Sequence, residues 1–452
     1  MKKNVFLAAV CALGLLPLAG CSNPAVELQQ GDIVFTRHPY IDLENVPEKI
    51  SVEVDIPGSI TRGIFGSRTA VSASSLGYKD GILTIDTSIL YDDDGNLAIT
   101  AGEQTLRLFT SEGTVEIPIL LATKVLRTAE DILDLNDYIE NPDAMAGSYI
   151  LGNDIDLSSV ENFEPLGYSD SVDGTHYQDT FNGVFDGNGY TISGAKSRWN
   201  SNLENNENVY EGNPLWTDIS HSSGDNWGFF QEIGEAGVVR NVRFADCSFA
   251  GRSIVGTVAG IVSGKIENVI VDSSCQVMAS THFYDESCNA AGIVGIVGAS
   301  GTLSTSICLT DDISIVSQYT DYGDAYLDSD VDAEGNPVPY HVYYTGSKGM
   351  TDSNGVLSTG VYGGAGLTYG TSSNSFSVKG GESVSFSQTH LEANKPGDGP
   401  DSGNLIDCGS YSLSGENSLS SASLYGAFDT SVWNIIDGQV PTLAASYPYV
   451  IY

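Results

Sequence analysis

The chain has 452 residues, of which 58 are acidic and 19 are basic, so its formal net charge is −39. This charge argues against nucleic acid as a partner, because such binding depends on Lys and Arg side chains that neutralise phosphates, and against docking on anionic lipid headgroups. Hydrophobic residues make up 41% of the chain, which argues against general disorder.

Residues 1–20 predict a bacterial lipoprotein signal peptide. Two lysines precede an apolar run over 5–18, which is too short to span a bilayer. The run ends in Leu18-Ala19-Gly20-Cys21, which resembles a lipobox. The resemblance implies cleavage before Cys21, acylation of its thiol and a lipid anchor. Ser22, rather than Asp, follows the cysteine and favours the outer membrane. An ordinary secretory signal with a chance cysteine is the alternative.

Residues 21–31 predict a short tether, and residues 32–125 predict an Ig-like antiparallel β-sandwich. Residues 51–56 and 82–86 alternate between polar and apolar side chains, as half-buried strands do. Further strands are expected over 97–109 and 114–121, and several short strands at this spacing are typical of a sandwich.

One amphipathic helix is predicted over 128–140. Thr128 stands at the N-cap position and Asp131 follows it at the capping-box position. A helix between two β regions would cover a sheet edge. Its apolar face would consist of Ile132, Leu133, Leu135 and Ile139.

Residues 126–452 carry imperfect repeats of short strands and glycine turns. Asn241-Val242 recurs as Asn268-Val269, 27 residues later. A single rung of this kind cannot bury its apolar side, whereas stacked rungs share a continuous core. We therefore predict parallel stacking in which Asn241 and Asn268 bond to each other, with glycine supplying positive φ at the corners. An antiparallel sandwich of hairpins is the alternative.

Two phrases resemble the GLUG-motif repeat proteins of bacterial surfaces. The first is Phe-Asn-Gly-Val-Phe-Asp-Gly-Asn-Gly-Tyr-Thr-Ile at 181–192, and the second is the ending Trp-Asn-Ile-Ile-Asp-Gly-Gln-Val-Pro-Thr-Leu at 433–443. The resemblance covers about 126–312 and 420–445. It implies a right-handed parallel β-helix-like solenoid with an adhesive or matrix role. Large secreted metallopeptidases share these repeats, but this chain has no His-Glu-x-x-His. The expected fold class is therefore all-β: a sandwich, then a solenoid capped by one short α-helix.

A first insertion, 196–227, interrupts the repeats. Aromatic faces beside many asparagines suit stacking on sugar rings. The aromatics could equally pack over the flank of the solenoid, or form a protein–protein patch. The candidate ligand-binding residues are Trp199, Tyr210, Trp216 and Trp227.

A second insertion, 318–345, is rich in tyrosine and aspartate. Its triplet Asp328, Asp330 and Asp332 begins like an EF-hand loop. The pattern then fails, because Ala333 stands where glycine is needed and Pro339 where glutamate is needed. Calcium at this triplet is an alternative to a solvated acidic loop, and no other cofactor is expected.

Five cysteines besides Cys21 remain in the mature chain, an odd number that cannot pair completely. We expect most of them to be small buried fillers, with a Cys275–Cys288 disulfide as the alternative. The leading hypothesis is a non-catalytic surface adhesion or recognition protein with a glycan or surface-protein ligand. A polysaccharide lyase or glycoside hydrolase on the same solenoid, or a structural envelope component, are the alternatives. A hydrolase would need two carboxylates about 5–9 Å apart.

Overall fold

The structure is a computed structural model. The residues that it describes are 39–66, 69–92, 94–137, 143–170, 176–198, 226–252, 254–281, 289–320, 341–345, 351–352, 355–356, 360–362, 365–368, 370–378, 382–383, 404–405, 410–415 and 417–444.

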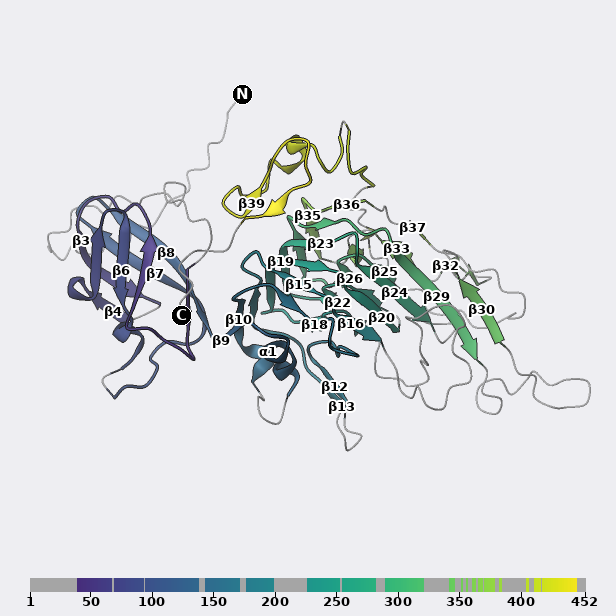
Figure 1. The fold of residues 1–452 in the computed structure, drawn as a ribbon, viewed down its shortest axis with the longest axis horizontal. Helices are drawn as coiled ribbons and strands as arrows, with labels where there is room; N and C mark the ends of the chain where they lie inside the picture. The colour runs from purple at the N-terminus through teal and green to yellow at the C-terminus, as the bar shows by residue number, and fades with distance from the viewer. Residues whose placement is uncertain are drawn as a thin grey trace, which may run out of the picture.

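Two β-sheets form the N-terminal region, drawn in purple and blue in Figure 1. Their strands are β1 Tyr40–Asp42, β2 Lys49–Glu53, β3 Ile60–Phe65, β4 Thr69–Ser72, β5 Leu76–Lys79, β6 Ile82–Asp86, β7 Gly102–Thr110 and β8 Thr114–Ala122. One sheet has the order β1-β8-β7-β3-β4 and the other β2-β6-β5. Alternating side chains such as Leu83 and Ile85 are buried in one apolar core that both sheets share, so the predicted sandwich is confirmed.

One strand pair makes the larger of these sheets mixed rather than antiparallel. β1 pairs with β8 in parallel, with Tyr40 opposite Leu120 and Asp42 opposite Ala122. The N–H of Leu120 donates to the carbonyl of Pro39 over 2.9 Å. The expectation of a wholly antiparallel sandwich is therefore wrong. The physical reason is that β1 satisfies backbone groups along the last part of β8, an edge that would otherwise stay open.

Four stacks of strands build the solenoid (Figure 1, teal to green). The first contains β9 Lys124–Leu126, β10 Ser148–Leu151, β14 Val184–Asp186, β19 Val238–Ala245, β23 Lys265–Val271, β27 Thr302–Ser304 and β35 Thr371–Ser373, flanked by β11 Ile155–Asp156, β15 Thr191–Ser193, β28 Ile307–Cys308 and β36 Phe376–Ser377. The second contains β16 Lys196–Arg198, β20 Ser248–Arg252, β24 Gln276–Thr281 and β29 Ile313–Thr320. The third contains β17 Asn226–Trp227, β21 Ile254–Gly256, β25 Asn289–Ala291 and β33 Gly360–Tyr362. The fourth contains β18 Phe230–Ile233, β22 Ala259–Val262, β26 Val294–Val297 and β34 Ala365–Thr368.

The chain visits these four stacks in turn, and neighbours within each stack run parallel. β19 lies beside β23, β20 beside β24, β21 beside β25 and β22 beside β26. Antiparallel partners follow at the C-terminal end: β30 His341–Thr345 on β29, β37 Glu382–Ser383 on β33 and β38 Asn404–Leu405 on β34. The parallel solenoid is thus confirmed, and the alternative of repetitive hairpins is wrong.

The repeated asparagines stack as predicted. Asn268 Nδ2 donates to Asn241 Oδ1 over 3.1 Å, and Asn241 Nδ2 donates to Asp186 Oδ1 over 3.0 Å. Asn241 and Asn268 have φ values of 55° and 54°. Asparagine, which tolerates the left-handed region better than most residues, takes this corner itself. Glycine supplies positive φ at other turns between solenoid strands, at Gly189 (82°) and Gly194 (73°), as expected.

A separate column of glycines marks another corner of the solenoid. A Cβ atom on Gly264 would lie 2.2 Å from the carbonyl oxygen of Gly237, and one on Gly370 would lie 2.2 Å from that of Gly301. Successive rungs therefore approach too closely at this corner for any side chain.

The helix α1 Ala129–Leu133 is shorter than predicted. The capping box of Thr128 and Asp131 is present, and Ile132 is buried. The chain then tightens into the 3-10 turn η4 Asp134–Asn136. The Asn136 side chain donates to the carbonyls of Glu164 and Pro165, which ties down this turn and ends the helix. Leu133, expected on the apolar face, is 39% exposed.

The C-terminal segment 417–444 lies over the first stack, in yellow in Figure 1. It contains the short hairpin β39 Trp433–Asn434 and β40 Thr442–Leu443. Its side chains Tyr425, Phe428 and Trp433 pack with Ile270 and Ile307 of the solenoid in a separate apolar cluster. Trp433 Nε1 donates to Asn268 Oδ1 over 3.1 Å. The segment that resembles the GLUG ending therefore binds the asparagine column directly.

Candidate functional site

Most sequence-predicted site residues lie outside the residues that the structure describes. These are Cys21, Trp199, Tyr210, Trp216, Asp328, Asp330 and Asp332. The fourth aromatic, Trp227, belongs to β17 and is 2% exposed. Its ring meets the edge of Tyr168 at a centroid distance of 5.1 Å. Trp227 thus lies in the core of the solenoid.

The cysteines that the structure describes are buried. Cys247, Cys275 and Cys308 are buried, which confirms the expectation of small core fillers for these three. Because Cys275 is free, the alternative of a Cys275–Cys288 disulfide is wrong.

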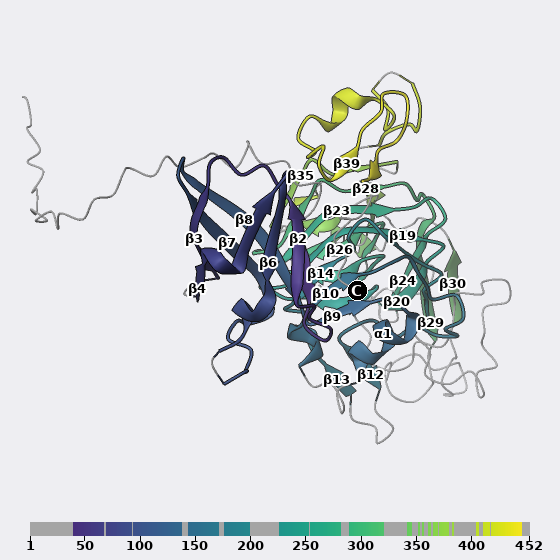
Figure 2. The same cartoon turned by 60° about the vertical axis from the view of Figure 1, so that its left-hand side comes forward.

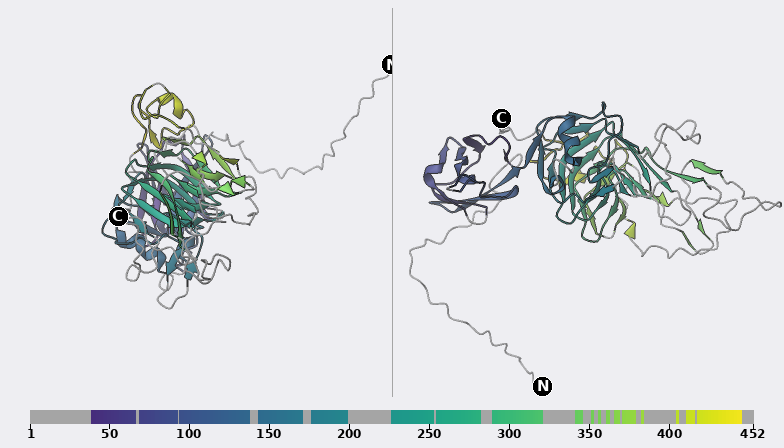
Figure 3. Two further views of the ribbon diagram at one scale, coloured as in Figure 1. Left: turned by 90° about the vertical axis from the view of Figure 1, so that its right-hand side faces the viewer. Right: turned by 90° about the horizontal axis from the view of Figure 1, so that it is seen from below.

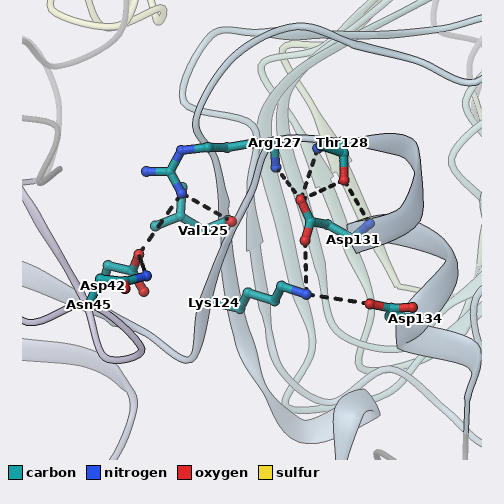
Figure 4. Close-up of polar contacts among 8 residues, drawn as sticks. All are labelled: Asp42, Asn45, Lys124, Val125, Arg127, Thr128, Asp131 and Asp134. Atoms are coloured by element: carbon teal, nitrogen blue, oxygen red, sulfur yellow. Dashed lines mark hydrogen bonds and ion pairs between the residues drawn. The ribbon is translucent and has the colours of Figure 1, made fainter.

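A cluster of polar side chains lies where the sandwich meets the start of the solenoid (Figure 4). Lys124 Nζ lies 2.9 Å from Asp131 Oδ1 and 3.6 Å from Asp134 Oδ2. Asp131 Oδ2 accepts the N–H groups of Arg127 and Thr128, each over 2.9 Å. Burial opposes ionisation of Asp131, but Lys124 and these donors outweigh it and lower its pKa to about 2. Asp131 is therefore ionised at neutral pH.

Arg127 extends this cluster to the sandwich. Its Nη1 lies 4.0 Å from Oδ2 of Asp42, the last residue of β1. Asp42 is buried and also accepts the N–H of Glu44 over 3.1 Å and Asn45 Nδ2 over 3.3 Å. Figure 4 shows Asp42 and Asn45 facing Arg127 across the junction. One side chain of the solenoid start thus reaches a buried carboxylate of the other region.

A second ionic network crosses the same junction. Arg240 Nε lies 2.8 Å from Asp186 Oδ2, and Arg240 Nη1 pairs with Glu103 of β7. Burial disfavours both charges, yet their attraction outweighs it, so the pKa of Asp186 is lowered and that of Arg240 is raised. In this network Arg240 Nη2 is buried without a hydrogen-bond partner among the described residues, as is Tyr40 Oη in β1.

The sequence contains a signal for part of this network that lies outside the motifs described above. Asp186, Arg240 and Glu267 occupy the same register position in successive strands. Their charges therefore alternate along one column. Aligning the residue before each repeated asparagine would have revealed Arg240 and Glu267 as neighbours, whereas Glu103 comes from a distant strand that no repeat predicts.

These clusters are suited to structure rather than to acid–base chemistry. A general acid or base works best when its pKa lies near the operating pH. Asp131 and Asp186 are both held well below that range by their partners. In the described ranges, no three His, Cys, Asp or Glu side chains converge in the way a metal site requires. The longest α-helix there, α1, has five residues, and none is long and apolar enough to cross a membrane.

Comparison with known proteins gives one partial similarity and no family. No protein-family model matches the chain. The chain is 29% identical over 217 residues to Halomucin from Haloquadratum walsbyi. This alignment covers 46% of the present chain but 2% of Halomucin. The similarity is thus confined to a small part of a far larger protein.

Proposed function

We propose that this chain is a lipid-anchored surface protein with a non-catalytic recognition role and a glycan as its ligand. The stacked solenoid carries this proposal, because a rigid coil with ion-paired carboxylates is suited to presenting loops rather than to proton transfer. Binding is assigned to Trp199, Tyr210 and Trp216, while Trp227 belongs to the buried core of the solenoid.

Two similarities support an extracellular role. The phrases at 181–192 and 433–443 resemble GLUG-motif repeats, and they form solenoid strands and the hairpin that packs on them. Halomucin is named as a mucin, and this chain is similar to a small part of it. Anchoring through Cys21, at the outer membrane, belongs to the same proposal.

A glycan array tests the ligand. The chain from Asn23 onward should bind a defined glycan set, and Trp199→Ala or Trp216→Ala should weaken binding about ten-fold or more, as loss of a central aromatic does. Tyr91→Ala is the matched control, because Tyr91 is an exposed aromatic of the sandwich (38%). Release of reducing sugar from a bound glycan would contradict the proposal and favour a carbohydrate-active enzyme.

Fatty-acid labelling tests the anchor separately. In a bacterial host, the full chain should incorporate labelled palmitate and partition with membranes. Cys21→Ala should abolish both. Labelling that persists in Cys21→Ala would show that the lipid is elsewhere or that the lipobox resemblance is accidental.

A further inference from the structure

The strand β1 stands first among the described strands, and the proposed anchor lies close before it. Pro39 follows Cys21 by 18 positions. Tyr40 and Ile41 are buried, at 0% and 1% exposure. β1 pairs with β8, so among the described strands this pair is the first that tension from the anchor would reach.

β8 leads directly into the solenoid. Only Thr123 separates β8 from β9, the first strand of the first stack. The N–H of Thr123 donates to the carbonyl of Ser148 over 2.6 Å, and Thr123 Oγ1 accepts the N–H of Ser148 over 3.0 Å. Force applied to the tether is therefore transmitted along β1, across its hydrogen bonds to β8, and through Thr123, which is hydrogen-bonded to Ser148, into the solenoid.

Further contacts hold the joint closed. Tyr40 and Leu120 from the sandwich pack with Val125 and Ile150 from the solenoid in one apolar cluster. Arg127 and Arg240 add the ion pairs to Asp42 and Glu103 described above. Figures 1 and 2 both place the sandwich beside β9 and β10, and Figure 3 shows the two regions side by side from below.

We propose that β1 and β8 form a tension-bearing clasp that transmits force from the membrane anchor to the solenoid. The pair can bear tension because its two strands run parallel. Tension pulls the N-terminal end of β1 one way and the C-terminal end of β8 the other way. In a parallel pair these ends lie at opposite edges of the ladder, so the strands slide along each other and their hydrogen bonds share the load.

An antiparallel β1 would behave differently. Its N-terminal end would lie beside the C-terminal end of β8, so the same pull would open the bonds one at a time. The parallel pairing of β1 with β8 is thus the arrangement that resists detachment. The force path depends on the proposed anchor at Cys21, but the mechanical strength of the joint does not.

Single-molecule pulling tests the clasp. The unlipidated chain from Ser22 would carry one handle on an N-terminal tag and one on a keto-bearing residue at the exposed position Ser300. We expect detachment of β1 as a high-force event that precedes unravelling of the solenoid. Ile41→Ala should lower this force, because it removes a buried side chain from β1.

Two controls isolate the effect. Arg107→Met removes an exposed ion pair with Glu116 from the same sheet and should leave the force unchanged. Handles at Ser74 and Ser300 bypass β1, so Ile41→Ala should then have no effect on the first event. Thermal unfolding checks that each variant folds. Leu43 follows β1, donates its N–H to Ala122 over 2.9 Å and packs on the sandwich core, so Leu43→Ala replaces Ile41→Ala if that variant does not fold.

A low-force first event in the natural sequence, equal to that of Ile41→Ala, would overturn the proposal. So would loss of the solenoid before β1 detaches. Failure of palmitate labelling would instead refute the anchor and leave these measurements intact.

Discussion

At the scale of single residues, Asn268 meets a backbone and a side-chain requirement together. Its φ is 54°, in the left-handed region that most residues avoid. Its Nδ2 donates to Asn241, while its Oδ1 accepts from Thr305 Oγ1 over 2.7 Å and from Trp433 Nε1 over 3.1 Å. One carboxamide therefore connects the corners of three successive rungs with one another and with the C-terminal segment.

Substituting Asn268 separates these two requirements. Asn268→Gly keeps the positive φ but leaves three partners unpaired, so we expect a loss of about 2 kcal/mol in the free energy of unfolding. Asn268→Ala should cost about 1 kcal/mol more, because alanine resists this φ. Urea denaturation of both variants measures the difference. Equal losses would show that the backbone angle contributes nothing.

Asp131 should make stability depend on pH at the acidic end. Its pKa is lowered from 3.8 to about 2 in the folded chain. A lowered pKa stabilises the fold above the unfolded value, and that contribution is lost as pH falls toward 2. Asp131→Asn should therefore reduce stability by about 2 kcal/mol at pH 7, with the difference shrinking between pH 4 and pH 2. A constant difference across this range in urea titrations would contradict the assignment.

At the scale of elements, buried charges on neighbouring strands neutralise one another. Arg240 is 6% exposed and pairs with Asp186 in the neighbouring strand. Arg240→Met would leave Asp186 as a buried, unpaired carboxylate, so we expect a loss of about 3–5 kcal/mol. Glu103→Gln is the control, since Glu103 is half exposed and should cost about 1 kcal/mol or less. If chemical denaturation shows that Glu103→Gln loses as much stability as Arg240→Met, the main interaction of Arg240 is with Glu103 instead.

The glycine column limits how rungs can vary. Gly264→Ala would place a methyl group 2.2 Å from a backbone oxygen that cannot move alone. We expect a loss of about 3 kcal/mol or more, from displaced rungs. Gly426→Ala is the matched control, because nothing lies within 4 Å of its Cβ position and its φ is negative. Thermal melts of both variants test this, and equal melting temperatures would contradict it.

At the scale of the whole molecule, the net charge of −39 opposes folding through mutual repulsion. Salt screens charges that lie more than about 10 Å apart at 0.1 M. The urea midpoint should therefore rise between about 0.02 M and about 0.5 M NaCl. A midpoint that falls with salt would indicate that the exposed ion pairs outweigh the general repulsion.

The sequence predicted the elements whose cause is local or repeated. The alternation over 82–86 gave a strand with those bounds, and Thr128 with Asp131 gave the helix start. The 27-residue recurrence of Asn-Val gave the parallel register, because stacking identical rungs places like residues in contact. The helix end was not predictable, since it depends on Asn136 binding carbonyls about 30 residues away.

The sequence by itself therefore determined the all-β class and the stacked solenoid, because periodicity and repeat spacing act between neighbouring strands. Only the tertiary structure decided the parallel direction of β1, the Glu103–Arg240 ion pair and the hydrogen bond from Trp433 to Asn268. Each of these joins segments separated by between 80 and 165 positions in the chain. No local pattern encodes such pairings, because they arise when preformed faces meet in the folded molecule.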